Sequence, residues 1–290
     1  MTRWKKTLGI VLILLLCLSF TLTGCAKSSD APADSTAPTT EPTMEPTPEP
    51  AAEPIEITVL AAASLTEAFT EMAESFESEH EGISVVLSFA GSQECVAQIE
   101  SGVAADIFAS ANTKYMDTVV AEGYVNTGAP VIFANNKLVA VCSKSVDPVP
   151  GFESLAEGDL MLVIADETVP VGKYTLAMLD NVTAAGTLPG YADKFLDAVV
   201  SKETNVKLVL SKVEMGEADC GIVYTSDAVS ADQDAVYTVD IPGEYNVVAT
   251  YPVAVLKESA HQDAAQLFLE YILSGTGSEI LLKYGLSKPE

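Results

Sequence analysis

The segment that decides the fold of this chain is Thr58-Val59-Leu60-Ala61-Ala62-Ala63-Ser64-Leu65-Thr66-Glu67. Residues 55–60 are rich in apolar and β-branched side chains, which is typical of a buried strand. Ser64 follows small residues, and Glu67 comes three positions later, so a capping box predicts that Ser64 begins a helix. A strand that runs through small residues into a helix N-terminus offers unpaired N–H groups to an anion. The alternative is that Ser64 only caps its own helix.

Strands alternate with helical patterns from residue 55 onwards, which predicts an α/β fold with largely parallel sheets. The expected strands are 55–60, 83–89, 106–109, 137–142, 160–165, 221–224, 235–241 and 247–256. The expected helices are 65–79, 93–101, 113–122, one near Pro170, 191–199, one that opens at 204–206, 260–273 and 276–284. Asn112 is expected to cap its helix, and Ser226 and Asp227 are expected to start a turn.

The strand that follows Ala134-Asn135-Asn136 is interpreted as a crossing into a second lobe. This interpretation places residues 55–135 and 248–290 in lobe 1 and residues 136–247 in lobe 2. A lobe interrupted by another lobe leaves a cleft between them, where ligands commonly bind.

The N-terminus has the features of a targeting segment. Basic residues precede an apolar core that is short for a membrane span, and Leu22-Thr23-Gly24-Cys25 follows. This pattern resembles a bacterial lipoprotein signal, so residues 1–24 are expected to be removed and Cys25 to be acylated. The alternative is an uncleaved membrane anchor. Residues 25–54, the lipid-anchor cysteine and a proline-rich linker, are expected to form an extended spacer.

Composition excludes several classes of partner and site. A net charge of −26 argues against nucleic acid and anionic lipid surfaces as partners of the folded part. Cys95, Cys142 and Cys220 lie in apolar contexts without metal-type spacing, so we expect buried free thiols. The two histidines, His80 and His261, are expected at the surface, which leaves no credible catalytic triad and predicts that the protein is not an enzyme.

Five motifs, in this order along the chain, resemble the molybdate-binding component of an ABC transporter. They are Val59-Leu60-Ala61-Ala62-Ala63-Ser64-Leu65, Phe89-Ala90-Gly91-Ser92, residues 98–110, Val169-Pro170-Val171-Gly172-Lys173-Tyr174 and residues 221–228. The resemblance covers residues 55–285 and implies a two-lobe fold of the periplasmic-binding-protein type (type II). Each lobe would be a mostly parallel sheet flanked by helices, and the two would close over a tetrahedral oxyanion.

The resemblance also implies the ligand-binding residues. The side-chain hydroxyls fall on Ser64, Ser92 and Tyr224, and the backbone N–H contacts fall on Val171 and Val206. Val171 stands where the family usually has alanine, and the serine-rich turn is reduced to Gly91-Ser92-Gln93. Because the contact at Val171 uses the main-chain N–H, the hydrogen bond to the ligand is expected to form with valine as it does with alanine.

These residue types suit a fully ionised oxyanion, which only accepts hydrogen bonds. None of the five positions is Asp or Glu, which disfavours monoprotonated phosphate because it needs an acceptor. Neutralisation is expected from helix N-termini, with no cation site and no cofactor other than the bound ligand.

The leading hypothesis is an extracytoplasmic, lipid-anchored protein of the cell membrane that captures molybdate, and also tungstate. The resemblance implies a monomer that docks on a permease driven by an ATPase subunit. Three alternatives stay open: a sulfate or thiosulfate binder, a non-transport surface lipoprotein, and a hydrolase that uses Ser64 as nucleophile.

Overall fold

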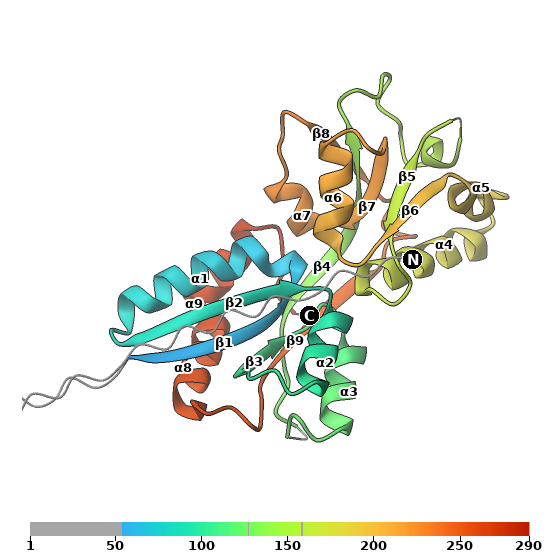
Figure 1. Ribbon diagram of the computed structural model, residues 1–290. Coiled ribbons are helices and arrows are strands. Elements are labelled where there is room, and N and C mark those ends of the chain that lie inside the picture. Colours follow the sequence, from blue (N-terminus) through green and yellow to red (C-terminus); the bar gives the residue numbers. More distant parts are fainter. Residues whose placement is uncertain (1–53, 127, 158, 290) are drawn as a thin grey trace, which may run out of the picture. The chain divides into compact units, whose positions relative to one another are not determined.

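The computed structural model describes residues 54–126, 128–157 and 159–289 (Figure 1). The predicted signal segment, the acylation of Cys25 and nearly all of the predicted linker lie outside these residues. Within the described ranges, none of the helices has the length and apolar character that crossing a membrane requires.

The first group of strands is built around β1 (Ile55–Ala62). It pairs in parallel with β2 (Ile83–Ala90) and with β3 (Ile107–Ala109), and β3 pairs antiparallel with β9 (Val248–Val255). Successive β1 residues serve opposite faces, because Val59 belongs to one buried cluster and Leu60 to another. Both faces of this part of the sheet are therefore covered.

Helices cover the two faces of these strands (Figure 1). One layer is α1 (Thr66–Glu79), α8 (Gln262–Leu273) and α9 (Gly275–Lys283), in which Phe76 meets Phe268 and Tyr271 edge to face at 5.0 and 5.5 Å between ring centroids. The other layer is α2 (Ser92–Glu100) and α3 (Thr113–Ala121), which pack on the Leu60 cluster. The apolar spacing that predicted the helix over 65–79 is the face that α1 buries.

The second group of strands begins in the C-terminal half of β4 (Val131–Ser143). That half pairs antiparallel with β7 (Cys220–Tyr224) and β8 (Val236–Asp240), and β5 (Leu162–Ala165) pairs in parallel with β7 and β6 (Val199–Glu203). The helices of this part are α4 (Pro170–Ala185), α5 (Tyr191–Asp197), α6 (Val206–Glu214) and α7 (Thr225–Ser230). Two short helices, η1 (Ala63–Leu65) and η2 (Glu153–Ala156), complete the described elements.

The strand β4 connects the two groups. It pairs with β9 from Val131 to Lys137 and with β7 from Leu138 onwards, which gives the strand order β2-β1-β3-β9-β4-β7-β5-β6 with β8 beside β4. The predicted boundary between residues 135 and 136 falls inside β4, and the return at residue 248 coincides with the start of β9. The lobe boundaries themselves stay a prediction.

Local signals placed the helix starts well. Asn112 caps α3 by accepting from Tyr115 N at 3.1 Å, Asn205 caps α6 through Leu208 N at 3.1 Å, and Pro170 opens α4. The expected helix over 191–199 ends at Asp197, and Val199–Glu203 forms β6, a short edge strand that the sequence did not predict. Ser226 and Asp227 lie within α7 where a turn was expected.

The capping box at Ser64 is not formed. Ser64 lies inside η1, the residue that caps α1 is Leu65, and α1 has no side-chain cap. The Ser64 hydroxyl instead lies 2.8 Å from the Tyr251 hydroxyl, and the Glu67 carboxylate pairs with Lys207. Both side chains of the predicted capping box therefore bond to residues that are distant in the sequence.

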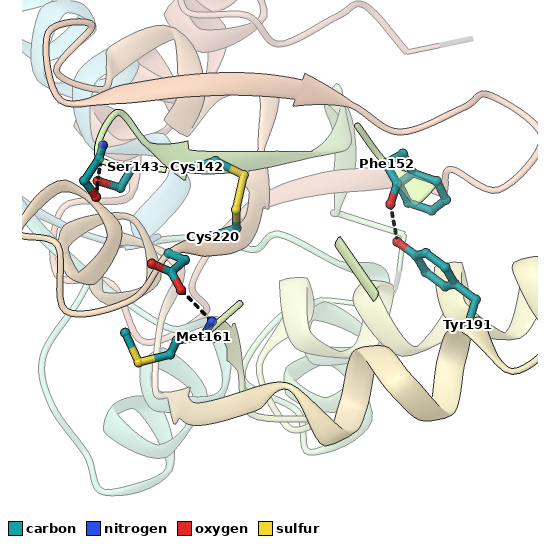
Figure 2. The surroundings of a disulfide bond; sticks show 8 residues. Cys142, Ser143, Phe152, Met161, Tyr191 and Cys220 are labelled. Atoms are coloured by element: carbon teal, nitrogen blue, oxygen red, sulfur yellow. Dashed lines mark hydrogen bonds between the residues drawn. A yellow bond between two sulfur atoms is a disulfide. The ribbon is translucent and has the colours of Figure 1, made fainter. Parts of the chain in front are cut away.

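The prediction of three free thiols is wrong for two of them. Cys142 and Cys220 form a disulfide between β4 and β7 (Figure 2), and Cys95 is free and buried. The two cysteines are direct partners in the strand register, with Cα atoms 4.0 Å apart. Ser143 N donates to Asp219 O, so the cysteines occupy a non-hydrogen-bonded pair, in which facing side chains lie closest.

A thiol count tests this pairing on a soluble chain of residues 26–290, which keeps the whole compact unit from Ala51 to Glu290. We expect one reactive thiol, Cys95, after denaturation without reductant, and three after reduction. Replacing Cys142 and Cys220 by serine should lower the free energy of unfolding by about 2–4 kcal/mol, measured by denaturant titration. Three thiols in the unreduced chain would contradict the disulfide.

Candidate functional site

A small cavity collects all five residues that the sequence predicted to bind ligand. Its volume is about 10 Å³, close to the smallest that holds one water molecule. It is lined by Ala62, Ala63, Ser64, Ala90, Gly91, Ser92, Ala111, Val169, Pro170, Val171, Asn205, Val206 and Tyr224. None of the described residues that line the cavity carries a charged side chain.

The two serines are buried, and each has a neighbour behind it. Ser92 Oγ accepts a hydrogen bond from Ala111 N at 3.0 Å, so its own proton remains available to another group. Ser64 Oγ lies 2.8 Å from Tyr251 Oη, on β9. Both hydroxyls can therefore donate toward the cavity while they accept from the protein.

Tyr224, at the end of β7, places a hydroxyl at the cavity that has no hydrogen-bond partner among the described residues. The side chain is only 1% exposed. Burial, followed by the neighbouring Tyr251 and Tyr174, raises the pKa of Tyr224 well above its ordinary value, so the hydroxyl keeps its proton. Because an unpaired buried hydroxyl costs about 1–3 kcal/mol, a ligand that accepts its proton is the natural explanation.

Helix N-termini supply the remaining donors. The helices α2, α4 and α6 begin at Ser92, Pro170 and Val206, all of which line the cavity. N–H groups in a first turn have no acceptor within their helix, and each N-terminus carries about half a positive charge. Since proline has no N–H, Val171 offers the first donor of α4.

Two glycines allow the segments around the cavity to approach closely. A Cβ added at Gly91 would lie 2.6 Å from Thr204 O, and one added at Gly172 would lie 2.0 Å from Asp166 O. Both distances are too short for any larger residue, so these two helix starts require glycine.

Direct hydrogen bonds hold segments from the two groups of strands around the cavity. Gln93 Nε2 donates to Thr204 O at 2.7 Å, and Tyr115 Oη donates to Thr168 O. These bonds join α2 and α3 to the loops that precede α6 and α4. The segments on opposite sides of the cavity are therefore in direct contact with each other.

A cluster of three charges lies beside the cavity. Lys207 Nζ, on α6, is 2.7 Å from Glu67 Oε2 and 3.2 Å from Asp227 Oδ1, and Asp227 is fully buried. Burial raises the pKa of Asp227 although Lys207 opposes it. Burial alone would lower the pKa of Lys207, but the two carboxylates outweigh it and the pKa is raised. Asp227 Oδ2 also accepts from Tyr224 N at 3.2 Å, so the cluster fixes the backbone that carries the Tyr224 hydroxyl.

The sequence did not identify the residues that support the Ser64 and Ser92 side chains. Tyr251, Asn136 and Ala111 have no local pattern that marks them, because their roles depend on strands brought together by the fold. Lys173, considered as a charge partner for the ligand, is exposed and does not line the cavity, whereas Lys207 lies one residue after a lining residue.

Comparisons with known proteins identify the relatives of this chain. A family model described as "Bacterial extracellular solute-binding protein" matches residues 57–287. The molybdate-binding protein ModA of Mycobacterium tuberculosis is 36% identical over 234 residues, covering 80% of this chain and 85% of that protein. The corresponding ModA of Escherichia coli is 34% identical over 239 residues, covering 80% and 89%.

A solved structure is also similar at the level of sequence. It is the substrate-binding domain of a putative molybdenum ABC transporter from Clostridium difficile, with a TM-score of 0.62 and 31% identity. The match covers 81% of this chain and 100% of that one.

The charge cluster makes a prediction about stability. Lys207→Met leaves Asp227 buried without its counter-charge, which should lower the free energy of unfolding by about 3–5 kcal/mol in denaturant titration at pH 7. Adding Asp227→Asn should recover much of the loss. The control is Lys283→Met, whose ion pair with Glu71 is exposed and screened by solvent, so little change is expected. Equal effects of the two lysine substitutions would contradict a buried role for Lys207.

Proposed function

Because the chain belongs to the family of bacterial extracellular solute-binding proteins, we propose that its solute is molybdate, which it delivers to an ABC importer. The observation that carries this proposal is the buried cavity in which uncharged hydroxyls and helix N-termini converge, with Tyr224 Oη unpartnered among the described residues. Relatives named as molybdate-binding proteins support the choice of ion.

The donor set suits a fully ionised oxyanion. Ser64, Ser92 and Tyr224 offer hydroxyl protons, and the first turns at Val171 and Val206 offer N–H groups. A carboxylate facing the cavity would repel a dianion but would accept the proton of a monoprotonated phosphate. The lining residues include no carboxylate among those described, which favours molybdate over phosphate.

The arrangement also reconciles an anionic ligand with a net charge of −26. Surface charges are screened over about 8–10 Å at ordinary ionic strength, whereas helix N-termini act at contact distance in a site that excludes water. The near field of the helices therefore dominates the energy of the bound ion.

The proposal includes tungstate as a second ligand, because it has the same charge and tetrahedral shape as molybdate. Sulfate, with its smaller radius, is the main rival, and cavity dimensions would have to distinguish the two. A hydrolase is less well supported, because the partner of Ser64 Oγ is a tyrosine hydroxyl and not a base.

We also propose that the protein is a monomer, held at the extracytoplasmic face of the cell membrane by acylated Cys25. There it would meet the permease and ATPase subunits of its importer. The Cys142–Cys220 disulfide supports a location outside the cytoplasm, since such bonds persist in oxidising compartments.

Calorimetric titration of the soluble chain with molybdate, tungstate, sulfate and phosphate tests the function. We expect tight binding of molybdate and tungstate, weak binding of sulfate and none of phosphate. Ser92→Ala and Tyr224→Phe should each weaken molybdate binding by about 10- to 100-fold, because each removes a hydrogen bond to an ion. Selective binding of sulfate would contradict the proposed solute.

The matched control for these variants is Tyr191→Phe, which removes a buried hydroxyl that donates to Phe152 O at 2.8 Å, away from the cavity (Figure 2). Its molybdate affinity should equal that of the wild type. Thermal melting without ligand shows whether each variant is folded. Unchanged affinity in folded Ser92→Ala and Tyr224→Phe would remove these assignments.

Molybdate affinity should be constant between pH 7 and about pH 9.5 at fixed ionic strength. An ordinary tyrosine has a pKa of about 10 and would begin to lose its proton in this range. Because burial raises the pKa of Tyr224, its proton is retained and affinity is lost only at higher pH. Calorimetry from pH 7 to about pH 11 checks this, and a decline centred at about pH 10 or lower that is absent in Tyr224→Phe would show that the pKa is not raised.

A further inference from the structure

The Ser64 hydroxyl lies at the end of a chain of buried groups that do not line the cavity. Tyr251 Oη, on β9, is 2.8 Å from Ser64 Oγ, and Asn136 Nδ2, on β4, is 3.4 Å from Tyr251 Oη. Tyr251 and Asn136 are 0% and 1% exposed, so water does not compete for these bonds. The chain runs from the strand crossing to the ligand cavity.

The orientation of the Asn136 amide is fixed by its neighbours. Its Oδ1 accepts from Lys137 N at 3.0 Å, and a backbone N–H can only donate. The amide nitrogen therefore faces Tyr251 and also Ser226 Oγ, 2.9 Å away. Since an amide NH₂ only donates, both hydroxyls must accept from it.

This orientation fixes the direction of the remaining hydrogen bonds. Tyr251 Oη accepts from Asn136, so its single proton is given to Ser64 Oγ, and the single proton of Ser64 is left for the cavity. In the reverse direction Ser64 would donate to Tyr251, and the Tyr251 proton would be left to the neighbouring Tyr224 hydroxyl, which makes no hydrogen bond with any described residue, so this direction is costly.

The same amide also holds the Ser64 backbone. Ser226 Oγ accepts from Asn136 and donates to Ser64 O at 3.2 Å. One assignment of protons therefore satisfies every bond in the network. Asn136 supports the Ser64 hydroxyl through Tyr251 and the Ser64 carbonyl group through Ser226.

We propose that Asn136 and Tyr251 form a donor chain that compels Ser64 to present a proton to the ligand, which makes them positioning residues that select fully ionised oxyanions over protonated ones. The proposal rests on the oxyanion-binding function proposed above. A serine free to rotate could accept a proton from monoprotonated phosphate as readily as it donates to molybdate. A serine that already accepts from Tyr251 has its own proton left for the ligand, because no other described group accepts that proton.

A double-mutant cycle on the soluble chain tests whether Tyr251 acts through Ser64. Tyr251→Phe, which removes only the hydroxyl, should weaken molybdate binding by about tenfold in calorimetry. In the Ser64→Ala background the same substitution should change affinity less than twofold, because the group it orients is gone. A purely structural role of Tyr251 would give the same loss in both backgrounds.

The matched control is Tyr271→Phe, which removes another largely buried tyrosine hydroxyl, bonded to Ser75 Oγ at 2.7 Å on α1 and outside the cavity lining. It should leave molybdate affinity unchanged in both backgrounds. If Tyr251→Phe does not fold, Asn136→Ala breaks the chain one step earlier and is used in the same cycle.

Inorganic phosphate at pH 7 provides the second measurement. We expect no detectable phosphate binding by the wild type and measurable phosphate binding by Tyr251→Phe, because the Ser64 hydroxyl is then free to turn and accept a proton from the ion. Absence of phosphate binding by Tyr251→Phe, or an equal loss in the two backgrounds of the cycle, overturns the donor chain while molybdate binding by the wild type stands. A wild-type chain that binds no oxyanion overturns the proposed function and the donor chain together.

Discussion

The antiparallel pairing of β4 with β9 is the contact on which the rest of the structure depends. Through it, β1 to β3 on one side and β5 to β8 on the other become parts of one continuous sheet path (Figure 1). The loops that follow strands of both groups then meet at a single cavity, where Ser64, Ser92, Val171, Val206 and Tyr224 are brought together. Tyr251 and Asn136 lie on these same two strands, so the groups behind the cavity belong to the crossing itself.

A site made of neutral donors has a requirement that a lysine or arginine site does not have. Each hydroxyl has one proton and can act as donor or acceptor. Whether it donates to the ligand therefore depends on the protein group from which it accepts a hydrogen bond. Ala111 N supplies that partner for Ser92. For Ser64, the partner is the Tyr251 hydroxyl. The charges of Lys207, Glu67 and Asp227 bind one another, which leaves the ligand to the uncharged groups.

The parts of the site that the sequence predicted are those with a local pattern. Ser64, Ser92 and Val206 follow small or capping residues at helix starts, and such signals are contained within a few positions. The parts that were missed depend on distant partners. Ser64 and Tyr251 are 187 positions apart, and Cys142 and Cys220 are 78 apart, so neither pair could be inferred before the strand register was known. The edge strand β6 was missed because it is short and only half-buried, with a pattern that extends the preceding helix equally well.

The disulfide described between β4 and β7 has a consequence for the ligand site at the far end of the same strand pair. Cys220 opens β7 and Tyr224 closes it, with Cys142 and Leu138 as their partners on β4. Slippage of β7 by a single position would turn every side chain of the strand to the opposite face and would carry the Tyr224 ring out of the cavity wall. A disulfide at one end of so short a strand prevents that slippage. The Cys142–Cys220 bond therefore fixes the register that places the Tyr224 hydroxyl at the cavity, although it makes no contact with that hydroxyl.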